Sequence, residues 1–348
     1  MIQRKTSRGR AFWRNTMLVL LLALIGAAAW GWHDFSRFAD APLRVSAQSE
    51  SIDIGRGSSF KEIVKQLREQ RLSGAAPLYW RLLAVQMQAA GRLHAGEYAT
   101  PVGITPRQLL ANMVAGRVLQ RNFTLVDGWT FREVLAALAK ADKLKHDTIG
   151  LDDAAIMQKI GAPGEQPEGR FLPETYAYVK GDSDLDILRR AHAAMVKTLD
   201  ELWPGRDKGL PLATPYDALI LASIVEKETG RADERAKIAG VFVRRLEDHM
   251  LLQTDPSVIY GMGDSYQGKI HKSDLTTDTP WNTYTRPGLP PTPIAMPGKP
   301  AIMAALHPEP GTTLYFVARG DGTHVFADTL AEQNRNVACY QLKQCSHD

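Results

Sequence analysis

The longest apolar run of the chain lies at residues 17–32, and every charged residue before it is basic. A helix that crosses a bilayer needs about 20 apolar residues, and the tryptophans near both ends of this run suit a membrane interface. We therefore expect a single-pass anchor at residues 15–33, with a basic cytoplasmic tail at residues 1–14 and the rest of the chain outside the inner membrane. A cleavable signal peptide is the alternative, because the run contains small residues at positions 26–29.

Residues 34–50 are polar and without periodicity, which is typical of a tether. From residue 51 onward one pattern recurs three times: an extended segment, a glycine turn, and a helix that begins after a Ser or Thr. In each copy Glu or Gln follows three residues later, so that the two side chains satisfy each other's backbone donors. These expected capping boxes are Ser59/Glu62, Thr105/Gln108 and Thr130/Glu133. Another helix is expected at residues 76–91.

The first copy and the helix after it resemble the LysM modules that bind glycan chains, whose opening strand leads into a Gly-x-Ser/Thr turn and a helix. This resemblance implies a small LysM-like glycan-binding domain at residues 51–122. A strand, a turn and a capped helix are common structural parts, so packing alone explains any single copy equally well.

The remaining residues, 123–348, combine long helices with a loop-rich region and a hairpin. Apolar periodicity predicts helices at residues 185–202, 214–229 and 232–248. Pro, Gly, Thr, Tyr and Asn dominate residues 252–310, which predicts loops of the kind that build a cleft. In residues 314–328, apolar and polar side chains alternate on either side of a Gly-Asp-Gly turn, which predicts a β-hairpin. The expected fold class is α+β, with an N-terminal membrane anchor helix, a small LysM-like βα domain and a mixed α/β domain that carries the chemistry.

One of the predicted helices is apolar on nearly all sides. It begins at Thr214, which suits an N-cap because a proline follows at the first helical position. Between residues 218 and 225 the only polar residue is Ser223, and a helix of this kind belongs in the interior of a domain. The helix nevertheless finishes in two carboxylates, Glu226 and Glu228.

The two glutamates point about 200° apart on a helix, so their spacing alone does not choose between them. Glu228 continues the apolar stripe and lies at the helix end beside Thr229, where a cleft can open. Loss of solvent and the negative end of the helix dipole would raise the pKa of Glu228, and a general acid needs such a carboxyl group. The alternative is that both glutamates are solvated and paired with Lys227 or with the arginines that follow.

Charge and cysteine content exclude several functions. The formal net charge is only +4 and the Lys and Arg residues are scattered, so nothing indicates nucleic-acid binding. The nine histidines show no metal-ligand spacing, and we expect neither a metal nor a cofactor. Cys339 and Cys345 can close a small terminal loop in an oxidising compartment.

The sequence also contains five longer motifs, most of which lie after residue 169. They are "GRFLPETYAY", "ASIVEKETG", "LLQTDPSVIYGMG", "WNTYTRPGLPPTPIAMPG" and "ALHPEPGTTLYFVARGDGTHVF". From the anchor to about residue 340 the chain resembles the endolytic murein transglycosylase family, the YceG-like proteins. The resemblance implies a membrane-anchored periplasmic enzyme that cuts the MurNAc-GlcNAc β-1,4 bond inside peptidoglycan strands, leaves 1,6-anhydroMurNAc ends and terminates glycan elongation.

The resemblance also implies the site and the partners. The essential acid of the family is the second glutamate of its E-K-E-T segment, which is Glu228 in this sequence. Residues 123–348 would form the catalytic domain, and the expected substrate-binding residues are Glu226, Thr229, Gln253, Asp255, Tyr260, Asn282 and Tyr284. The implied partners are peptidoglycan glycan strands, the inner membrane and cell-wall synthases.

Two other functions are compatible with the same sequence. A muramidase would break the same bond with water and leave reducing ends. A non-catalytic scaffold would bind glycan through its LysM-like part and link the membrane to the wall.

Overall fold

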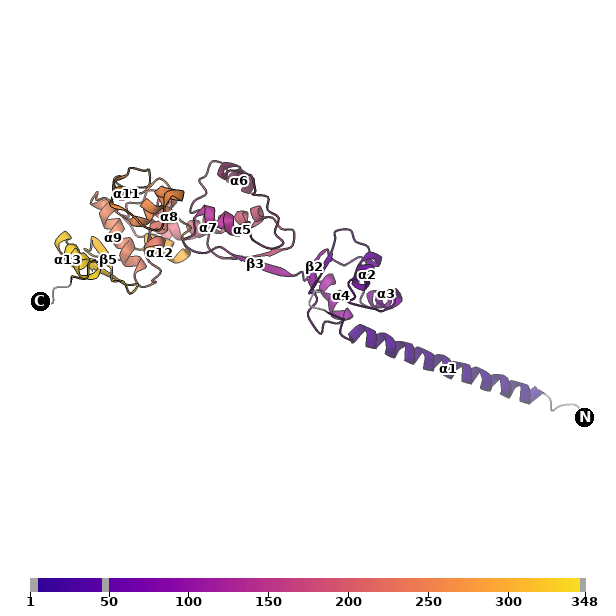
Figure 1. Cartoon of the computed structure of the whole chain (residues 1–348). Coiled ribbons are helices and arrows are strands. Elements are labelled where there is room, and N and C mark those ends of the chain that lie inside the picture. The colour runs from indigo at the N-terminus through magenta and orange to yellow at the C-terminus, as the bar shows by residue number, and fades with distance from the viewer. Residues whose placement is uncertain (1–5, 46–49, 345–348) are drawn as a thin grey trace, which may run out of the picture. The chain divides into compact units, whose positions relative to one another are not determined.

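The computed structural model describes residues 6–45 and 50–344. The chain divides into two compact units, residues 1–121 and 122–348. Helices predominate, and the strands form three short two-stranded sheets among the described residues, so the protein has a mixed helix and strand composition, as expected (Figure 1). The loop that Cys339 and Cys345 could close falls outside the described residues, because residue 345 is not among them.

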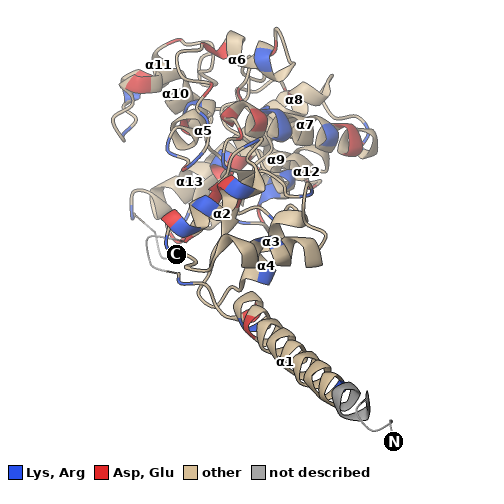
Figure 2. Ribbon diagram, turned by 90° about the vertical axis from the view of Figure 1, so that its right-hand side faces the viewer, with Lys and Arg blue, Asp and Glu red and all other residues tan. Residues whose placement is uncertain are grey.

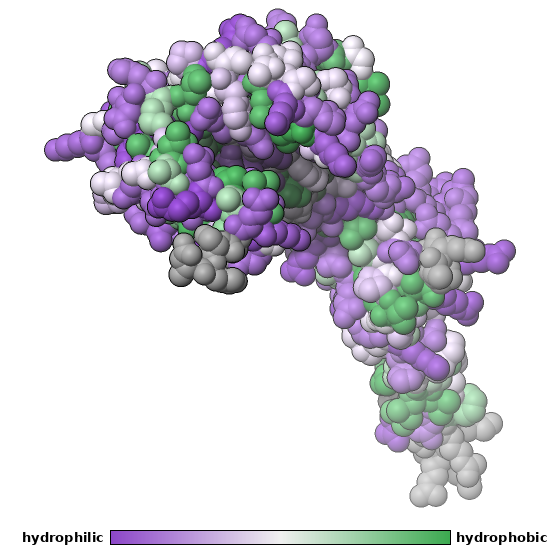
Figure 3. All heavy atoms as spheres, turned by 60° about the vertical axis from the view of Figure 1, so that its left-hand side comes forward, coloured by the Kyte–Doolittle hydropathy of each residue, from purple (hydrophilic) through white to green (hydrophobic). Residues whose placement is uncertain are grey.

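The first helix, α1 (Thr6–Asp40), is longer than the expected anchor. It carries no charged residue through its middle, and its hydrophobic side chains stand uncovered at the surface (Figures 2 and 3). Among the described residues it is the one helix that is long and apolar enough to cross a membrane, over Phe12–Asp40, although a signal sequence would have the same character. The helix is therefore a possible membrane anchor.

Residues 34–45, expected to be part of a tether, belong to the folded first unit. α1 continues to Asp40, and the side chains of Phe35 and Ala39 are buried in the core of the first unit. Phe35, Phe38 and Ala39 follow each other at helical spacing, so one face of this last part of α1 is apolar. The prediction was wrong for residues 34–40 because polar residues between these positions hide the pattern.

The first unit places two strands and three helices against the end of α1. Its elements are β1 (Ser51–Ile54), α2 (Phe60–Glu69), α3 (Pro77–Gln86), β2 (Gly96–Ala99) and α4 (Pro106–Val114). β1 and β2 pair antiparallel, with Ser51 opposite Ala99 and Ile54 opposite Gly96. The capping boxes predicted before α2 and α4 are both present.

The second unit contains the rest of the described chain. Its elements are β3 (Gln120–Thr124), α5 (Phe131–Leu138), α6 (Asp153–Ile160), β4 (Thr175–Val179), α7 (Asp184–Leu202), α8 (Pro215–Glu228), α9 (Arg235–Glu247), α10 (Asp255–Met262), α11 (Lys272–Thr276), α12 (Lys299–Leu306), β5 (Tyr315–Ala318), β6 (His324–Ala327) and α13 (Leu330–Tyr340), with short 3-10 turns at Trp203–Gly205 and Gly263–Ser265. The third predicted capping box, before α5, is present, and β5 and β6 form the predicted antiparallel hairpin.

α8 is the central element of the second unit. Its residues 218–225 are all buried, and α7, α9 and α12 contribute to the same apolar cluster. α12 lies in the region predicted to be mostly loop, residues 252–310, which also contains α10 and α11. The loop prediction missed α12 because Gly298 and Pro300 read as loop residues, whereas they form the N-cap and the first turn of an apolar helix.

Ser223 joins this central helix to the proline-rich segment. Its hydroxyl donates to the backbone carbonyl of Ile220 at 2.7 Å and accepts from the backbone N–H of Ile294 at 3.0 Å. Both the serine and Ile294 are buried.

We expect Ser223→Ala to lower the free energy of unfolding by about 1–3 kcal/mol, because the N–H of Ile294 loses its acceptor in the interior. Urea denaturation would measure the change. Ser265→Ala, which removes an exposed hydroxyl that donates to Met262, is the control and should change stability by less than about 0.5 kcal/mol. Equal effects of the two substitutions would contradict this account of Ser223.

Candidate active site

Helix α8 carries Glu228 from the core to the surface. The hydroxyl of Thr214 caps its first turn, as predicted, and the structure adds a capping box with Asp217. The helix then runs through the apolar core and ends at Glu228, which is partly exposed, while Thr229 after it is buried and extended. An interior helix thus delivers one carboxyl group to the boundary between core and solvent.

The hydroxyl of Thr254 donates a hydrogen bond to Glu228 Oε1. Thr254 is buried and is held in turn by its backbone N–H, which donates to the hydroxyl of Thr283 at 3.0 Å. The residue before it, Gln253, is exposed and adopts a left-handed backbone with φ of 52°. Non-glycine residues seldom adopt this conformation, and it occurs mostly where the surrounding structure enforces it. The backbone before α10 is therefore shaped to bring Thr254 to the acid.

Burial raises the pKa of Glu228 from 4.5 to about 7. The hydrogen bond from Thr254 opposes this shift, the negative charge of Asp255 reinforces it, and the positive charges of His324 and Arg245 weaken it. A carboxyl group with this pKa is protonated in a substantial fraction of molecules at neutral pH. It can give up a proton and take one back, which is the requirement for general acid and base catalysis.

The two basic neighbours of Glu228 are themselves fixed. Arg245 is buried, and its guanidinium donates to the backbone carbonyls of Leu314 at 2.7 Å and Leu252 at 2.9 Å. Burial lowers the pKa of this arginine. The Nδ1 atom of His324 lies 2.7 Å from Glu234 Oε2, and the backbone N–H of the histidine donates to the other carboxylate oxygen at 3.0 Å. Helix α9 and the β5–β6 hairpin therefore hold these two side chains in fixed positions.

Asp255 and Tyr284 form a second pair beside Glu228. The tyrosine hydroxyl donates to Asp255 Oδ1 at 2.6 Å, and burial together with this carboxylate raises the pKa of Tyr284. Asn282 fixes the backbone at Tyr284. Its fully buried amide accepts from the backbone N–H of Tyr284 at 2.9 Å and donates to the carbonyl of Thr277 at 2.7 Å. The amide of Asn282 is thus bonded within the chain and positions the loop.

Glu226 lies apart from Glu228, on the other side of α8. Its Oε2 accepts from the backbone N–H of Gly298 at 3.0 Å, and Arg235 lies 3.8 Å from its Oε1. Burial raises the pKa of Glu226 as well. A side chain at Gly298 would collide with Asp127 and meet Glu226, so the chain passes very close to the helix end at this point. The hydrogen bond with Gly298 gives Glu226 the role of joining the end of α8 to the start of α12.

The same junction is closed by the segment around Gly128. The ammonium group of Lys227 donates to the carbonyl of Gly128 at 3.2 Å. The backbone N–H of Gly128 donates to Met296 at 2.8 Å, and that of Met296 to Trp129 at 2.7 Å. The start of α5, the end of α8 and the start of α12 are therefore tied together.

A pocket of about 830 Å³ opens beside this junction. Glu168 lines it and is only 7% exposed, and Tyr260 and Trp281 contribute an edge-to-face aromatic pair with ring centres 5.5 Å apart. Tyr260 donates to Glu168 Oε2 at 3.1 Å, and the backbone N–H of Phe131 donates to Glu168 Oε1 at 3.1 Å. Burial raises the pKa of Glu168 to about 7 against the effect of these donors.

Helix α10 connects the pocket with the acid. Its first residue, Asp255, influences Glu228, and Tyr260, which lies five residues later, lines the pocket. Five residues of helix span about 8 Å. The pocket and the acid therefore lie near opposite ends of one short helix.

The structure brings together some of the residues expected in the site and separates others. One neighbourhood contains Glu228, Thr229, Asp255 and Tyr284, and Gln253 lies beside it, next to Thr254. Three expected residues lie elsewhere: Tyr260 lines the pocket, Glu226 faces the junction and Asn282 is internal. Four further residues were not assigned from sequence: Glu168, Arg245, Thr254 and His324. Three of them lie within or next to the quoted motifs, but only the folded chain places them against a carboxyl group.

The family model described as "YceG-like family" matches residues 52–339, which is most of the chain. The chain belongs to the YceG-like family. The structure is also similar to the crystal structure of a YceG-like protein from Listeria monocytogenes, with a TM-score of 0.51 and 28% identity, covering 82% of this chain and 98% of that one.

Two relatives of this YceG-like chain have a named activity. The endolytic murein transglycosylase of Bacillus subtilis strain 168 is 29% identical over 309 residues, which cover 83% of this chain and 84% of the relative. The endolytic murein transglycosylase of Streptococcus pneumoniae serotype 2 strain D39 is 26% identical over 357 residues, which cover 92% of this chain but 64% of the relative.

The raised pKa of Glu228 makes stability depend on pH. Between about pH 4.5 and 7 the folded chain holds a proton on Glu228 that the unfolded chain has lost, so the free energy of unfolding falls as the pH rises through this window. Glu168 contributes a fall of the same sign. We expect Glu228→Gln to show a smaller fall and to be more stable than the wild type above pH 7, as measured by urea denaturation from pH 5 to pH 8.

Glu247→Gln is the matched control, since it removes an exposed carboxyl group from α9. It should leave the pH dependence of stability unchanged. If Glu228→Gln followed the wild-type profile, the carboxyl group of Glu228 would titrate normally and the account of its burial would be wrong.

Proposed function

We propose that this YceG-like protein is a lytic transglycosylase of peptidoglycan. It would cleave the MurNAc-GlcNAc β-1,4 bond within glycan strands and leave 1,6-anhydroMurNAc ends. The observation that supports this most is Glu228, a carboxyl group desolvated at the end of a core helix yet still partly exposed, with a pKa of about 7. The two named relatives, which are endolytic murein transglycosylases, support the same conclusion.

In the proposed mechanism Glu228 acts twice. It first donates its proton to the glycosidic oxygen as the bond from the anomeric carbon of MurNAc to that oxygen breaks. The resulting carboxylate then takes the proton of the MurNAc 6-hydroxyl as that oxygen bonds to the anomeric carbon. The proton returns to Glu228 and water is not consumed, so one carboxyl group is sufficient where an ordinary glycosidase needs two.

Asp255 and Tyr284 have complementary roles in this proposal. The negative charge of Asp255 favours the protonated form of Glu228 before the reaction. During bond cleavage positive charge develops on the sugar ring, and a nearby carboxylate stabilises such charge. Tyr284 holds Asp255 in place through its hydrogen bond, and Arg245 and His324 offset part of the negative charge that remains once Glu228 has lost its proton.

The pocket along α10 is the proposed binding site for neighbouring sugars. Its aromatic side chains suit sugar faces, and its polar groups suit hydroxyl and N-acetyl groups. Tyr260 and Trp281 would form the platform, while Glu168 fixes Tyr260 by accepting its hydroxyl proton. Gln253, which is exposed next to the acid, is an additional candidate for contact with the strand.

The location and the biological role are part of the same proposal. α1 would anchor the chain in the inner membrane with its N-terminus in the cytoplasm, so that the catalytic unit meets nascent strands in the periplasm. The first unit, with its antiparallel β1–β2 pair and two intervening helices, would act as a LysM-like glycan-binding domain. Cleavage close to the membrane would terminate glycan elongation, in contact with cell-wall synthases.

We expect Glu228→Gln to abolish cleavage of intact sacculi, since an amide cannot donate the proton that the leaving oxygen needs. Loss of one general acid costs typically 10²–10⁴-fold in rate. Mass spectrometry of the released fragments should show anhydro-muramoyl ends with the wild type and none with the variant. The variant should remain folded and should still bind sacculi.

Glu201→Gln, an exposed change on α7, is the matched control and should cleave as the wild type does. Reducing muramoyl ends from the wild type would instead show a hydrolytic muramidase. A wild-type chain that binds sacculi without releasing any fragments would indicate the non-catalytic scaffold.

The pH dependence of cleavage tests the environment of the acid. Activity should fall as the pH rises above about 7, because Glu228 must be protonated to start the reaction. The hydroxyl of Thr254 stabilises the carboxylate form, so Thr254→Val should raise the pKa of Glu228 and move this alkaline limb to higher pH. Initial rates on sacculi between pH 5 and pH 9 would measure the shift.

Thr254→Ser keeps the hydroxyl, so its activity should fall over the same alkaline pH range as that of the wild type. If Thr254→Val lowered the rate equally at every pH, Thr254 would serve only to shape the loop, and its hydrogen bond would not tune the acid.

A further inference from the structure

Helix α3 of the first unit is apolar on both of its faces. One face packs into the core through the buried side chains of Trp80, Leu83 and Ala84. The opposite face presents Leu78, Leu82 and Val85 to solvent, with exposures of 63%, 47% and 72%. These three positions follow each other at i, i+4 and i+7, so they form one continuous stripe. A contiguous apolar stripe on a surface helix indicates a contact with something else.

The position of α3 along α1 indicates what covers the exposed apolar stripe. The hydroxyl of Tyr79 donates to Asp34, and the ring of Tyr79 stacks on Phe35 with centres 6.5 Å apart. Phe35 in turn contacts Trp32, whose ring centre lies 5.8 Å away. Asp34 is the first charged residue after the apolar run, and tryptophans at the end of such a run lie at the membrane interface.

α3 therefore lies beside the C-terminal part of α1, which follows the apolar run (Figure 1). Leu78 is the neighbour of Tyr79, which contacts α1 at Asp34 and Phe35, two and three residues beyond Trp32. A helix residue advances about 1.5 Å along the axis, so the α1 residues that contact Tyr79 lie about 3–5 Å along the axis from that tryptophan.

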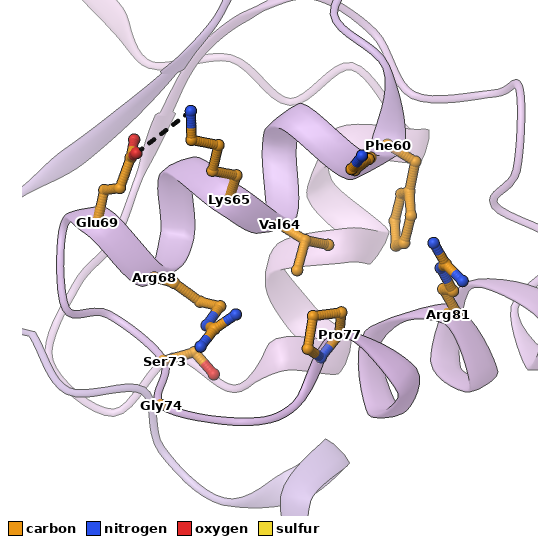
Figure 4. Close-up of a pocket in the computed structure, with 10 residues that line it drawn as sticks. Phe60, Val64, Lys65, Arg68, Glu69, Ser73, Gly74, Pro77 and Arg81 are labelled. Atoms are coloured by element: carbon orange, nitrogen blue, oxygen red, sulfur yellow. Dashed lines mark ion pairs between the residues drawn. The ribbon is translucent and has the colours of Figure 1, made fainter.

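Basic side chains adjoin the apolar stripe. A pocket of about 620 Å³ between α2 and α3 is lined by Lys61, Lys65, Arg68 and Arg81, together with apolar atoms of Val64 and others. Arg68 and Arg81 lie on opposite sides of Val64 and Pro77 (Figure 4). Glu69, 3.6 Å from Lys65, is the acidic residue in the lining. A basic site with an apolar floor suits an anionic group attached to an apolar chain.

We propose that α3 lies in the headgroup layer of the bilayer that α1 spans, and that the pocket between α2 and α3 holds the phosphate of an anionic phospholipid. The inference rests on α1 acting as the membrane anchor of the proposed function. An interfacial helix combines an apolar face in the acyl boundary with basic residues among the headgroups, and α3 with its pocket has both. The first unit then has two contacts with the membrane, one across it and one along its surface.

The test uses the full chain reconstituted in vesicles of phosphatidylethanolamine and phosphatidylglycerol. A benzophenone amino acid replaces Leu82 in one variant and Val102 in another. Val102 is 90% exposed and apolar too, but it belongs to the segment that pairs with Leu43 beyond the end of α1. After irradiation, cross-links to phospholipid should be several-fold more abundant at position 82 than at position 102, as measured by mass spectrometry.

Charge is tested separately with the benzophenone kept at position 82. Replacement of phosphatidylglycerol by phosphatidylcholine should lower the yield of lipid cross-links, and the double substitution Arg68→Glu and Arg81→Glu should lower it in phosphatidylglycerol vesicles. If the yield of lipid cross-links stayed the same after both changes, the assignment of the pocket to an anionic headgroup would be wrong.

Carbonate extraction of the same samples reports whether α1 is inserted. If α1 is inserted but position 82 cross-links no more lipid than position 102, or cross-links to protein, the inference is wrong and the anchor stands. If the chain is extracted from the vesicles, the anchor and the inference both fail, while cleavage of sacculi by Glu228 is unaffected.

Discussion

The site depends on one constraint: a carboxyl group must lose most of its water without losing access to a ligand. Glu228 meets this constraint because it is the last residue of a helix that is buried over the preceding turns. The apolar interior makes ionisation costly, while the single hydroxyl of Thr254 gives the charged form limited support. The balance leaves the pKa close to neutral, where the same group can serve as acid and then as base.

Much of this arrangement could be predicted from the sequence, because its signals are local. Capping boxes lie within four residues, so Ser59, Thr105, Thr130 and Thr214 identified helix starts that the structure confirms. The apolar run before Glu228 predicted a core helix for the same reason. Its position at the helix end, and then the resemblance to a family, favoured Glu228 over Glu226, a choice that the spacing on the helix alone left open.

The remaining features arise from contacts between distant segments, and a single sequence does not reveal such contacts. Arg245 and His324 reach the acid from a helix and a hairpin that follow it in the chain, and Glu168 reaches Tyr260 across 92 residues. The end of α1 was misread for a different reason: its apolar face contains few residues, and they are covered only once α3 packs against them.

The junction at Gly298 has a consequence for how a substrate is received. The side chains of Glu226 and Lys227 and the backbone of Met296 join three segments through hydrogen bonds, and there is no space for even a methyl group at Gly298, where the chain passes Asp127. This junction cannot move as a hinge without breaking several hydrogen bonds at once. The wall of the pocket beside it is therefore preformed. In the proposed function, glycan strands would then be selected by how well they fit a pocket whose wall is already in place.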